Sequence, residues 1–277
     1  MPFLKLLWRA CVWSILFLAL AAACSAVELS KDEIDFRKEV YVNKQGQRLQ
    51  YRLFVPVTYS KTQKYPLVMW LHGGEGRGSD NAHQLMKSNE KGSHFWTSPE
   101  NQLNFPAFVL APQCPIDDNW ADPELNEPGK PLLLAIEALD SVEKEFSIDP
   151  DRVYIVGQSM GGLGVWSLLQ TYPEKWAAAV VISAYDNFSN PMAITRIPLW
   201  VFQGDADQTV PVDLVRQMMK QLKKLHANLR YSEYRKADHE VWNRAFAEPE
   251  LLSWLFGQTR GQAREGQLGS SAAPVNH

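Results

Sequence analysis

The residues best suited to do chemistry in this sequence centre on a serine between two glycines. Ser159 lies in Gly157-Gln-Ser-Met-Gly161, after an apolar run at 153–156 and before helical spacing at 162–172. A serine on a sharp turn between a strand and a helix exposes its hydroxyl above the sheet, and the helix N-terminus favours negative charge there. The five-residue pattern alone also fits a structural turn. Its place between a strand and a helix favours a nucleophile.

A serine hydroxyl is a weak nucleophile until a base removes its proton, and a third group must orient that base. His239 is the candidate base. It lies in Ala237-Asp-His-Glu-Val-Trp242, just after a strand expected at 229–234. The order along the chain, with the serine first and the histidine last, is that of one known class of serine catalysts.

Three carboxylates compete for the role of the orienting acid. Asp205, Asp207 and Asp213 all follow the apolar run at 198–202, where the carboxyl end of a strand places site residues in α/β sheets. Spacing alone permits any of the three. Asp205 also suits a turn residue that hydrogen bonds to its own backbone.

Acyl transfer also needs N–H donors aimed at the tetrahedral oxyanion, each typically contributing about 3 to 4 kcal/mol. The amide of Met160, next to the serine, is one candidate. The second is expected in His72-Gly-Gly-Glu-Gly-Arg-Gly78, after the apolar run at 66–71, with Gly74 preferred and Glu75 as the alternative. This glycine-rich loop matches neither phosphate-binding pattern, and His72 is expected to hold it by hydrogen bonding.

The order of secondary-structure elements predicts how these groups are positioned. Short continuous apolar runs alternate with segments of helical spacing, which is typical of a mainly parallel sheet with helices on both faces. An antiparallel hairpin is expected at the N-terminal edge. The predicted hairpin strands are 40–42 and 49–55, the other strands 66–71, 107–111, 153–156, 177–183, 198–202 and 229–234, and the helices 132–146, 162–172 and 212–225.

Length and composition are consistent with one domain. The chain has 277 residues, of which 45% are hydrophobic and 21% charged, so it can bury a large core. We expect an α/β domain over 27–256 and a disordered tail over 257–277, rich in Gly, Gln, Ser and Ala. Only 14 residues, 184–197, separate two of the predicted strands, too few for a helical cap over the site.

Charge and cysteine content exclude several classes of function. A net charge of −3 offers no basic footprint for nucleic acid. Three cysteines (Cys11, Cys24 and Cys114) are too few for a disulfide framework, and Cys114 is expected to be a small buried residue. His83 and His94 lack partners at metal-ligand spacing, so neither a metal nor a cofactor is expected.

The N-terminus has the pattern of a secretory leader. Residues 1–26 carry Lys5 and Arg9, then an apolar run over 10–23 and small residues, and cleavage after Ala23 or Ala26 would fit. An uncleaved anchor is the alternative. The sequence before Cys24 is similar to a lipoprotein cleavage box, so membrane attachment is expected only through the leader or through lipidation of Cys24. The protein is expected to be secreted or periplasmic.

Five stretches together resemble one family of exported α/β-hydrolases, described as predicted peptidases or phospholipase/carboxylesterase-like esterases and related to feruloyl esterases and polyhydroxybutyrate depolymerases. The stretches are 71–81, 111–115 with Trp120, 149–162, 204–211 and 238–242. The resemblance implies an α/β-hydrolase fold and favours Asp207 as the acid, with Asp205 shaping the turn. Relatives often have His-Gly-Ala-Gly-Glu-Arg-Gly in the glycine-rich loop, so the departure here leaves the second amide donor open.

The resulting hypothesis is a serine carboxylesterase with a triad of Ser159, His239 and Asp207 and with Met160 and Gly74 as oxyanion donors. Its substrate would be a small ester or a short peptide. A serine peptidase acting on small peptides is the first alternative, and a non-catalytic binding protein is the second. An aromatic rim for the substrate, made of His94, Phe95, Trp96 and Trp120, competes with simple packing of these side chains.

Overall fold

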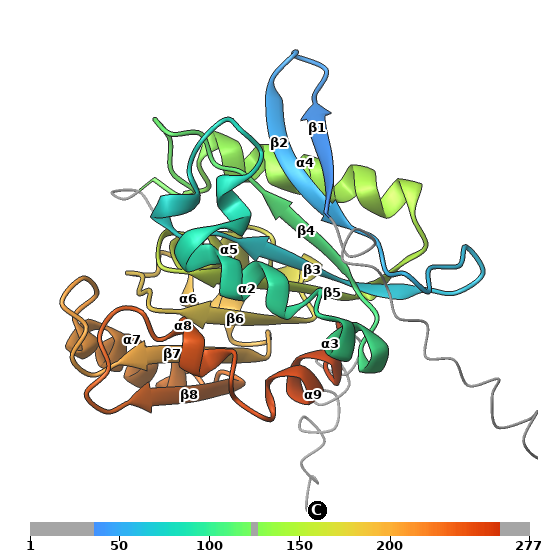
Figure 1. Ribbon diagram of the computed structural model, residues 1–277. Coiled ribbons are helices and arrows are strands. Elements are labelled where there is room, and N and C mark those ends of the chain that lie inside the picture. The colour runs from blue at the N-terminus through green and yellow to red at the C-terminus, as the bar shows by residue number, and fades with distance from the viewer. Residues whose placement is uncertain (1–35, 123–126, 261–277) are drawn as a thin grey trace, which may run out of the picture. The chain divides into compact units, whose positions relative to one another are not determined.

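The computed structural model describes residues 36–122 and 127–260 (Figure 1). The predicted leader 1–26, with Cys11 and Cys24, lies outside the described residues, as do 27–35 of the predicted domain and 261–277 of the predicted tail. No helix in the described ranges is long and apolar enough to span a bilayer.

The described strands form an eight-stranded mixed sheet, in the order β1-β2-β4-β3-β5-β6-β7-β8. β1 pairs antiparallel with β2 and β2 antiparallel with β4, and all the remaining neighbours are parallel. The predicted hairpin and the mainly parallel sheet are therefore confirmed. The strands are β1 Arg37–Val42, β2 Arg48–Phe54, β3 Tyr65–Leu71, β4 Phe108–Pro112, β5 Ile148–Gln158, β6 Ala178–Ile182, β7 Leu199–Gly204 and β8 Leu229–Tyr234.

Helices cover both faces of this sheet. All three predicted helices are present, as α4 Lys130–Glu145, α5 Met160–Thr171 and α7 Val212–Lys224. Sequence periodicity missed the shorter helices, which span too few residues to show a repeat. These are α2 Glu90–Phe95, α3 Pro99–Asn104, α6 Pro191–Ile194, α8 Trp242–Ala245 and α9 Leu251–Phe256, with the 3-10 turns η2 Gly74–Gly76, η3 His83–Leu85, η4 Lys87–Asn89 and η5 Pro173–Lys175.

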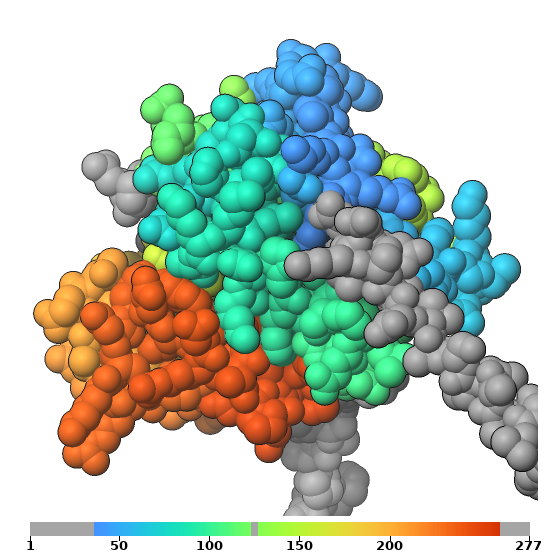
Figure 2. Space-filling view, viewed as in Figure 1, coloured from blue at the N-terminus to red at the C-terminus, as the bar shows by residue number. Residues whose placement is uncertain are grey.

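Two segments far apart in sequence, one with α2 and α3 and the other with α8 and α9, lie side by side in front of the sheet (Figure 1 and Figure 2), and α2 contacts α8. Aromatic side chains join them to the strands beneath. The Phe246 ring packs edge-on against Trp70 of β3, and Phe256 packs against Tyr154 of β5. Such contacts bury large apolar rings, so this layer belongs to the core.

As its length predicts, the connection from β6 to β7 holds no helical cap: its residues, all described, contain only the four-residue helix α6. The start of the predicted tail needs correction. Tyr154 Oη donates to the carbonyl of Gln258 at 2.9 Å, and Arg260 pairs with Asp151 at 3.1 Å, so residues 257–260 are held against the domain. These polar contacts leave no signal in composition.

Gly161 brings α5 into direct contact with the end of β3. A Cβ atom at this position would lie 2.0 Å from the carbonyl oxygen of Leu71 and 2.8 Å from that of His72. Both obstacles are backbone atoms, which cannot rotate away. The second glycine of the serine motif is therefore required by packing between helix and strand.

We predict that Gly161→Ala destabilises the fold by about 3 kcal/mol or more, because the added methyl group must push a helix off the sheet. Gly74→Ala is the matched control, since no atom lies within 4 Å of a Cβ at that position. Urea unfolding of both variants measures the effect. Equal stability of Gly161→Ala and the parent would contradict this account of the contact.

Candidate active site

Ser159 occupies a strained turn between β5 and α5. Its φ of 52° and ψ of −120° lie in a region that residues with a side chain rarely adopt. Its backbone N–H still donates to the carbonyl of Ile182 at 2.8 Å, so the serine is held in line with the sheet. The turn combines a fixed backbone with a hydroxyl at the carboxyl edge of the strands.

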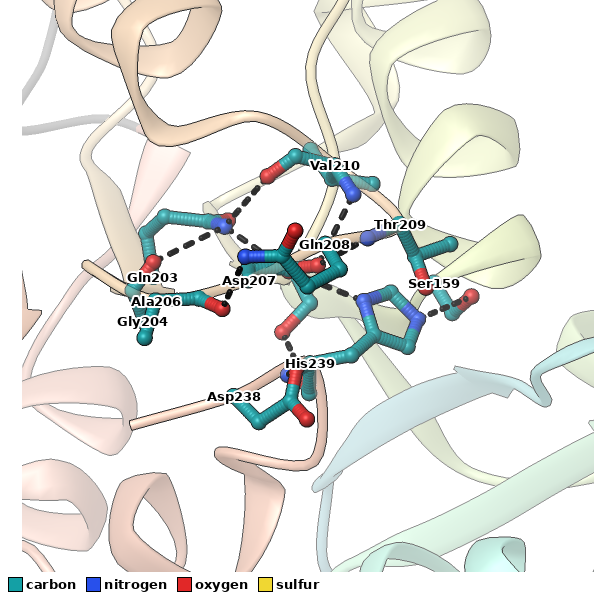
Figure 3. A network of polar contacts seen from close by, with 11 residues as sticks. Ser159, Gln203, Gly204, Ala206, Asp207, Gln208, Thr209, Val210, Asp238 and His239 are labelled. Carbon is teal, nitrogen blue, oxygen red and sulfur yellow. Dashed lines mark hydrogen bonds and ion pairs between the residues drawn. The ribbon is translucent and has the colours of Figure 1, made fainter. Parts of the chain in front are cut away.

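His239 bridges the serine and an aspartate (Figure 3). Its Nε2 lies 2.9 Å from Ser159 Oγ, and its Nδ1 lies 2.9 Å from Asp207 Oδ2. An ionised carboxylate only accepts hydrogen bonds, so the imidazole proton belongs on Nδ1. Nε2 is then free to accept the serine proton.

Asp207 is a buried carboxylate surrounded by donors. Its side chain has no exposed surface, and besides His239 it accepts hydrogen bonds from the N–H groups of Thr209 and Val210 and from Gln203 Nε2, each 2.8 Å long. Buried charge is tolerated when it is hydrogen bonded in this way. The position of the carboxylate is therefore fixed before any substrate binds.

The other two candidate acids lie away from the histidine. Asp205 accepts from the N–H of Lys236 at 2.5 Å, so its carboxylate bonds the turn that follows β8 and not its own backbone. Asp213 pairs with Arg216 on the exposed side of α7 at 2.9 Å. Among the three, the structure brings only Asp207 into contact with His239.

Sequence reasoning missed Gln203. This fully buried residue near the end of β7 donates from one amide nitrogen to Asp207 Oδ2 and, at 3.0 Å, to the carbonyl of Val210. It therefore ties the carboxylate to the loop that carries it (Figure 3). The sequence did contain one signal for this residue, which is polar and lies next to the end of an otherwise apolar strand.

His72 orients a peptide of the glycine-rich loop. Its Nε2 accepts the N–H of Cys114 at 3.0 Å, which leaves the imidazole proton on Nδ1 to donate to the carbonyl of Gly73 at 2.6 Å. Because a trans peptide is planar, holding that carbonyl turns the N–H of Gly74 the opposite way. His72 thus fixes the loop by hydrogen bonding, as predicted.

The same loop is anchored from two further sides. The N–H of Gly73 donates to Asn89 Oδ1 at 2.7 Å, and the indole of Trp120 donates to the carbonyl of His72 at 3.0 Å. Asn89 Oδ1 also accepts from Gln158 at 3.2 Å, so the residue before the serine is tied to the loop. Neither Asn89 nor Gln158 was singled out from the sequence.

Other residues considered from the sequence have structural surroundings. Cys114 is buried as predicted, and burial raises the pKa of its thiol to about 12, which makes it unreactive. Trp96 and Trp120 are buried and pack in the interior, so they do not form a rim, whereas His94 is exposed and Phe95 half-buried. No cluster of potential metal ligands occurs among residues 36–122 and 127–260.

We predict that His72 stays neutral well below neutral pH. Burial, with a smaller effect of the Arg77 charge, lowers its pKa from 6.5 to about 4, while the bond to Gly73 acts in the opposite direction. Since the unfolded chain takes up this proton first, the folded state should lose up to about 3 kcal/mol as pH falls from 6.5 to 4.

Nitrogen-15 NMR of labelled histidine checks that His72 stays neutral. It measures the midpoint of the His72 titration and shows which ring nitrogen carries the proton. The urea-unfolded protein serves as the control and should titrate near pH 6.5. A folded-state midpoint near 6.5 would rule out the neutral, loop-anchoring imidazole.

The chain is similar to known esterases in sequence and in structure. The model of the Esterase family matches residues 43–248. Carboxylesterase SOBER1 of Arabidopsis thaliana is 23% identical over 71% of this chain and 92% of its own length. A thermostable esterase of known structure is 37% identical with a TM-score of 0.78, covering 81% of this chain and 63% of that one.

More distant solved structures share the fold alone. A ferulic acid esterase from Anaeromyces mucronatus has a TM-score of 0.57 at 19% identity, covering 82% of this chain and 90% of its own. Peptidases also occur at this distance, with 12% and 16% identity. A shared fold at such identities does not fix the substrate.

Proposed function

Because this chain belongs to the Esterase family and is a carboxylesterase-type α/β-hydrolase, we propose that it cleaves esters through a covalent acyl-enzyme formed on Ser159. The observation that carries this proposal is the continuous contact from Ser159 Oγ through His239 to Asp207, with 2.9 Å at each step. A nucleophile, a base and an orienting acid in this arrangement are what acyl transfer requires.

The reaction proceeds in two balanced halves. Ser159 Oγ bonds to the ester carbonyl carbon while its proton moves to His239 Nε2. That proton then goes to the leaving alkoxide, which departs as the alcohol. Water repeats the attack on the acyl-enzyme, releases the acid and restores the serine. Asp207 keeps the imidazole in the Nδ1–H tautomer and stabilises the imidazolium formed in each half.

The oxyanion is stabilised by N–H groups that have no acceptor within their own helices. Met160 opens α5, and Gly74 opens η2. The carbonyl that orients the Gly74 amide is held at 2.6 Å by His72 and at 3.0 Å by the N–H of Gly76. The corresponding contact for the Glu75 amide, from Arg77 to the carbonyl of Gly74, is longer at 3.3 Å, which favours Gly74.

Short acyl groups fit the proposed site best, because the connection between β6 and β7 supplies no cap that would enclose a long chain. We expect p-nitrophenyl acetate and butyrate to be hydrolysed faster than the palmitate. Preferential cleavage of aminoacyl arylamides would instead favour the peptidase alternative.

We also propose that residues 1–26 direct export, as their charged and apolar pattern suggests. N-terminal sequencing and mass spectrometry of the exported protein would give the cleavage site and any lipid on Cys24. An intact N-terminus on protein retained in the cytoplasm would contradict export.

The direct test of the nucleophile is labelling with a fluorophosphonate probe. We expect the parent to be labelled and Ser159→Ala to be unlabelled and inactive on p-nitrophenyl acetate. Equal labelling of both proteins would exclude Ser159, and an unlabelled, inactive parent would favour the binding-protein alternative.

The choice of acid gives a further prediction. Asp207→Asn should lower kcat about 10³- to 10⁴-fold, because an amide no longer holds the required tautomer or balances the imidazolium. Asp205→Asn is the matched control and should retain nearly full activity, since its remaining carbonyl can still accept from Lys236. Steady-state kinetics on p-nitrophenyl acetate measures kcat for both variants. A larger loss of kcat in Asp205→Asn than in Asp207→Asn would assign the role of the orienting acid to Asp205.

A further inference from the structure

A row of polar side chains crosses the carboxyl ends of three neighbouring strands. In the sheet, Gln158 of β5 pairs with Ile182 of β6, which pairs with Phe202 of β7. The residues that follow these three in the chain are therefore neighbours: Ser159 just after β5, Ser183 just after β6, and Gln203 within β7. Two members of this row have roles in the site described above, and the middle one has none so far.

Ser183 shares a positive φ with the nucleophile. Its φ is 52°, as for Ser159, and its side chain is fully buried. Its N–H donates to the carbonyl of Phe202 at 2.9 Å, so the hydrogen bonding between β6 and β7 continues past the end of β6. Left-handed conformations of residues with a side chain cost energy and cluster at functional sites. This outlier therefore calls for a functional explanation.

Ser183 contacts the loop that carries His239, the proposed base. Ser183 Oγ donates a hydrogen bond of 2.7 Å to the backbone carbonyl of His239. The same carbonyl accepts the N–H of Val241 at 2.9 Å. Ser183 thus ties the main chain of His239 to the strand next to that of Ser159, across 56 residues of sequence.

The position of that main chain matters because the imidazole must meet two partners at once. Its two nitrogens lie 2.9 Å from Ser159 and 2.9 Å from Asp207, so a shift of the His239 backbone lengthens at least one of these contacts. Displacements of about 0.5 to 1 Å at such a point are enough to lower turnover.

We propose that Ser183 is a positioning residue that holds His239 at hydrogen-bonding distance from Ser159. This role rests on the proposed function. The hydroxyl acts only through the His239 backbone. Removing it should therefore lower kcat and leave KM nearly unchanged, because no substrate contact is lost.

Three substitutions separate the hydroxyl from the backbone strain. Ser183→Ala removes the hydroxyl and keeps the strain, whereas Ser183→Gly removes the hydroxyl and relieves the strain. Ser183→Cys keeps a weak donor in nearly the same shape. We expect kcat to fall about tenfold in the Ala and Gly variants and less in the Cys variant, with KM within about twofold of the parent.

Ser93→Ala is the matched control, since Ser93 is also fully buried and donates to a backbone carbonyl, that of Glu90, at 3.1 Å. Its kcat should equal that of the parent. The melting temperature of Ser183→Ala should change little, because the N–H of Val241 still satisfies the His239 carbonyl.

Fluorophosphonate labelling rates distinguish failure of this role from failure of the proposed function. Slower labelling of Ser159 in Ser183→Ala is the expected result. Unchanged labelling and kcat in Ser183→Ala, or full kcat in Ser183→Gly with a loss in Ser183→Ala, would overturn the positioning role while leaving the hydrolase intact. A parent that is not labelled at all would overturn the proposed function itself, and the positioning role with it.

Discussion

The parallel pairing of β5, β6, β7 and β8 is the constraint on which the site depends. Parallel strands end at a common edge, so the turns that follow them are neighbours however far apart they lie in sequence. Ser159 follows β5, Asp207 follows β7 and His239 follows β8. A shift of one residue in any of these registers would turn a site residue to the other face.

Burial of Asp207 makes this edge rigid. A carboxylate without water is stable only where several donors meet it, and here these come from its own turn, from Gln203 and from His239. The loops around it cannot move independently without breaking one of these bonds. The glycine-rich loop is held in a similar way through the neutral ring of His72, so both sides of Ser159 are fixed by hydrogen bonds.

Much of the fold was predictable because buried parallel strands and long amphipathic helices leave repeating patterns, as at β3, β6 and α7. The short helices α2, α3, α8 and α9 leave no period and could not be found. Ser159, His239 and the loop of Asp207 could be identified from the sequence, because the chemistry of the motifs requires these residue types. Gln203, Asn89 and Ser183 are polar residues outside any motif, and which partners such a side chain meets is decided by the folded structure.

The layer formed by α8 and α9 has a consequence for the order of synthesis. The helix α8 begins three residues after His239, and the rings of Phe246, directly after α8, and Phe256, at the end of α9, pack against Trp70 and Tyr154. A nascent chain already carries the nucleophile and the acid while this layer is still inside the ribosome. His239 and this layer therefore both belong to the last part of the domain to be synthesised, after the strands that carry Ser159 and Asp207.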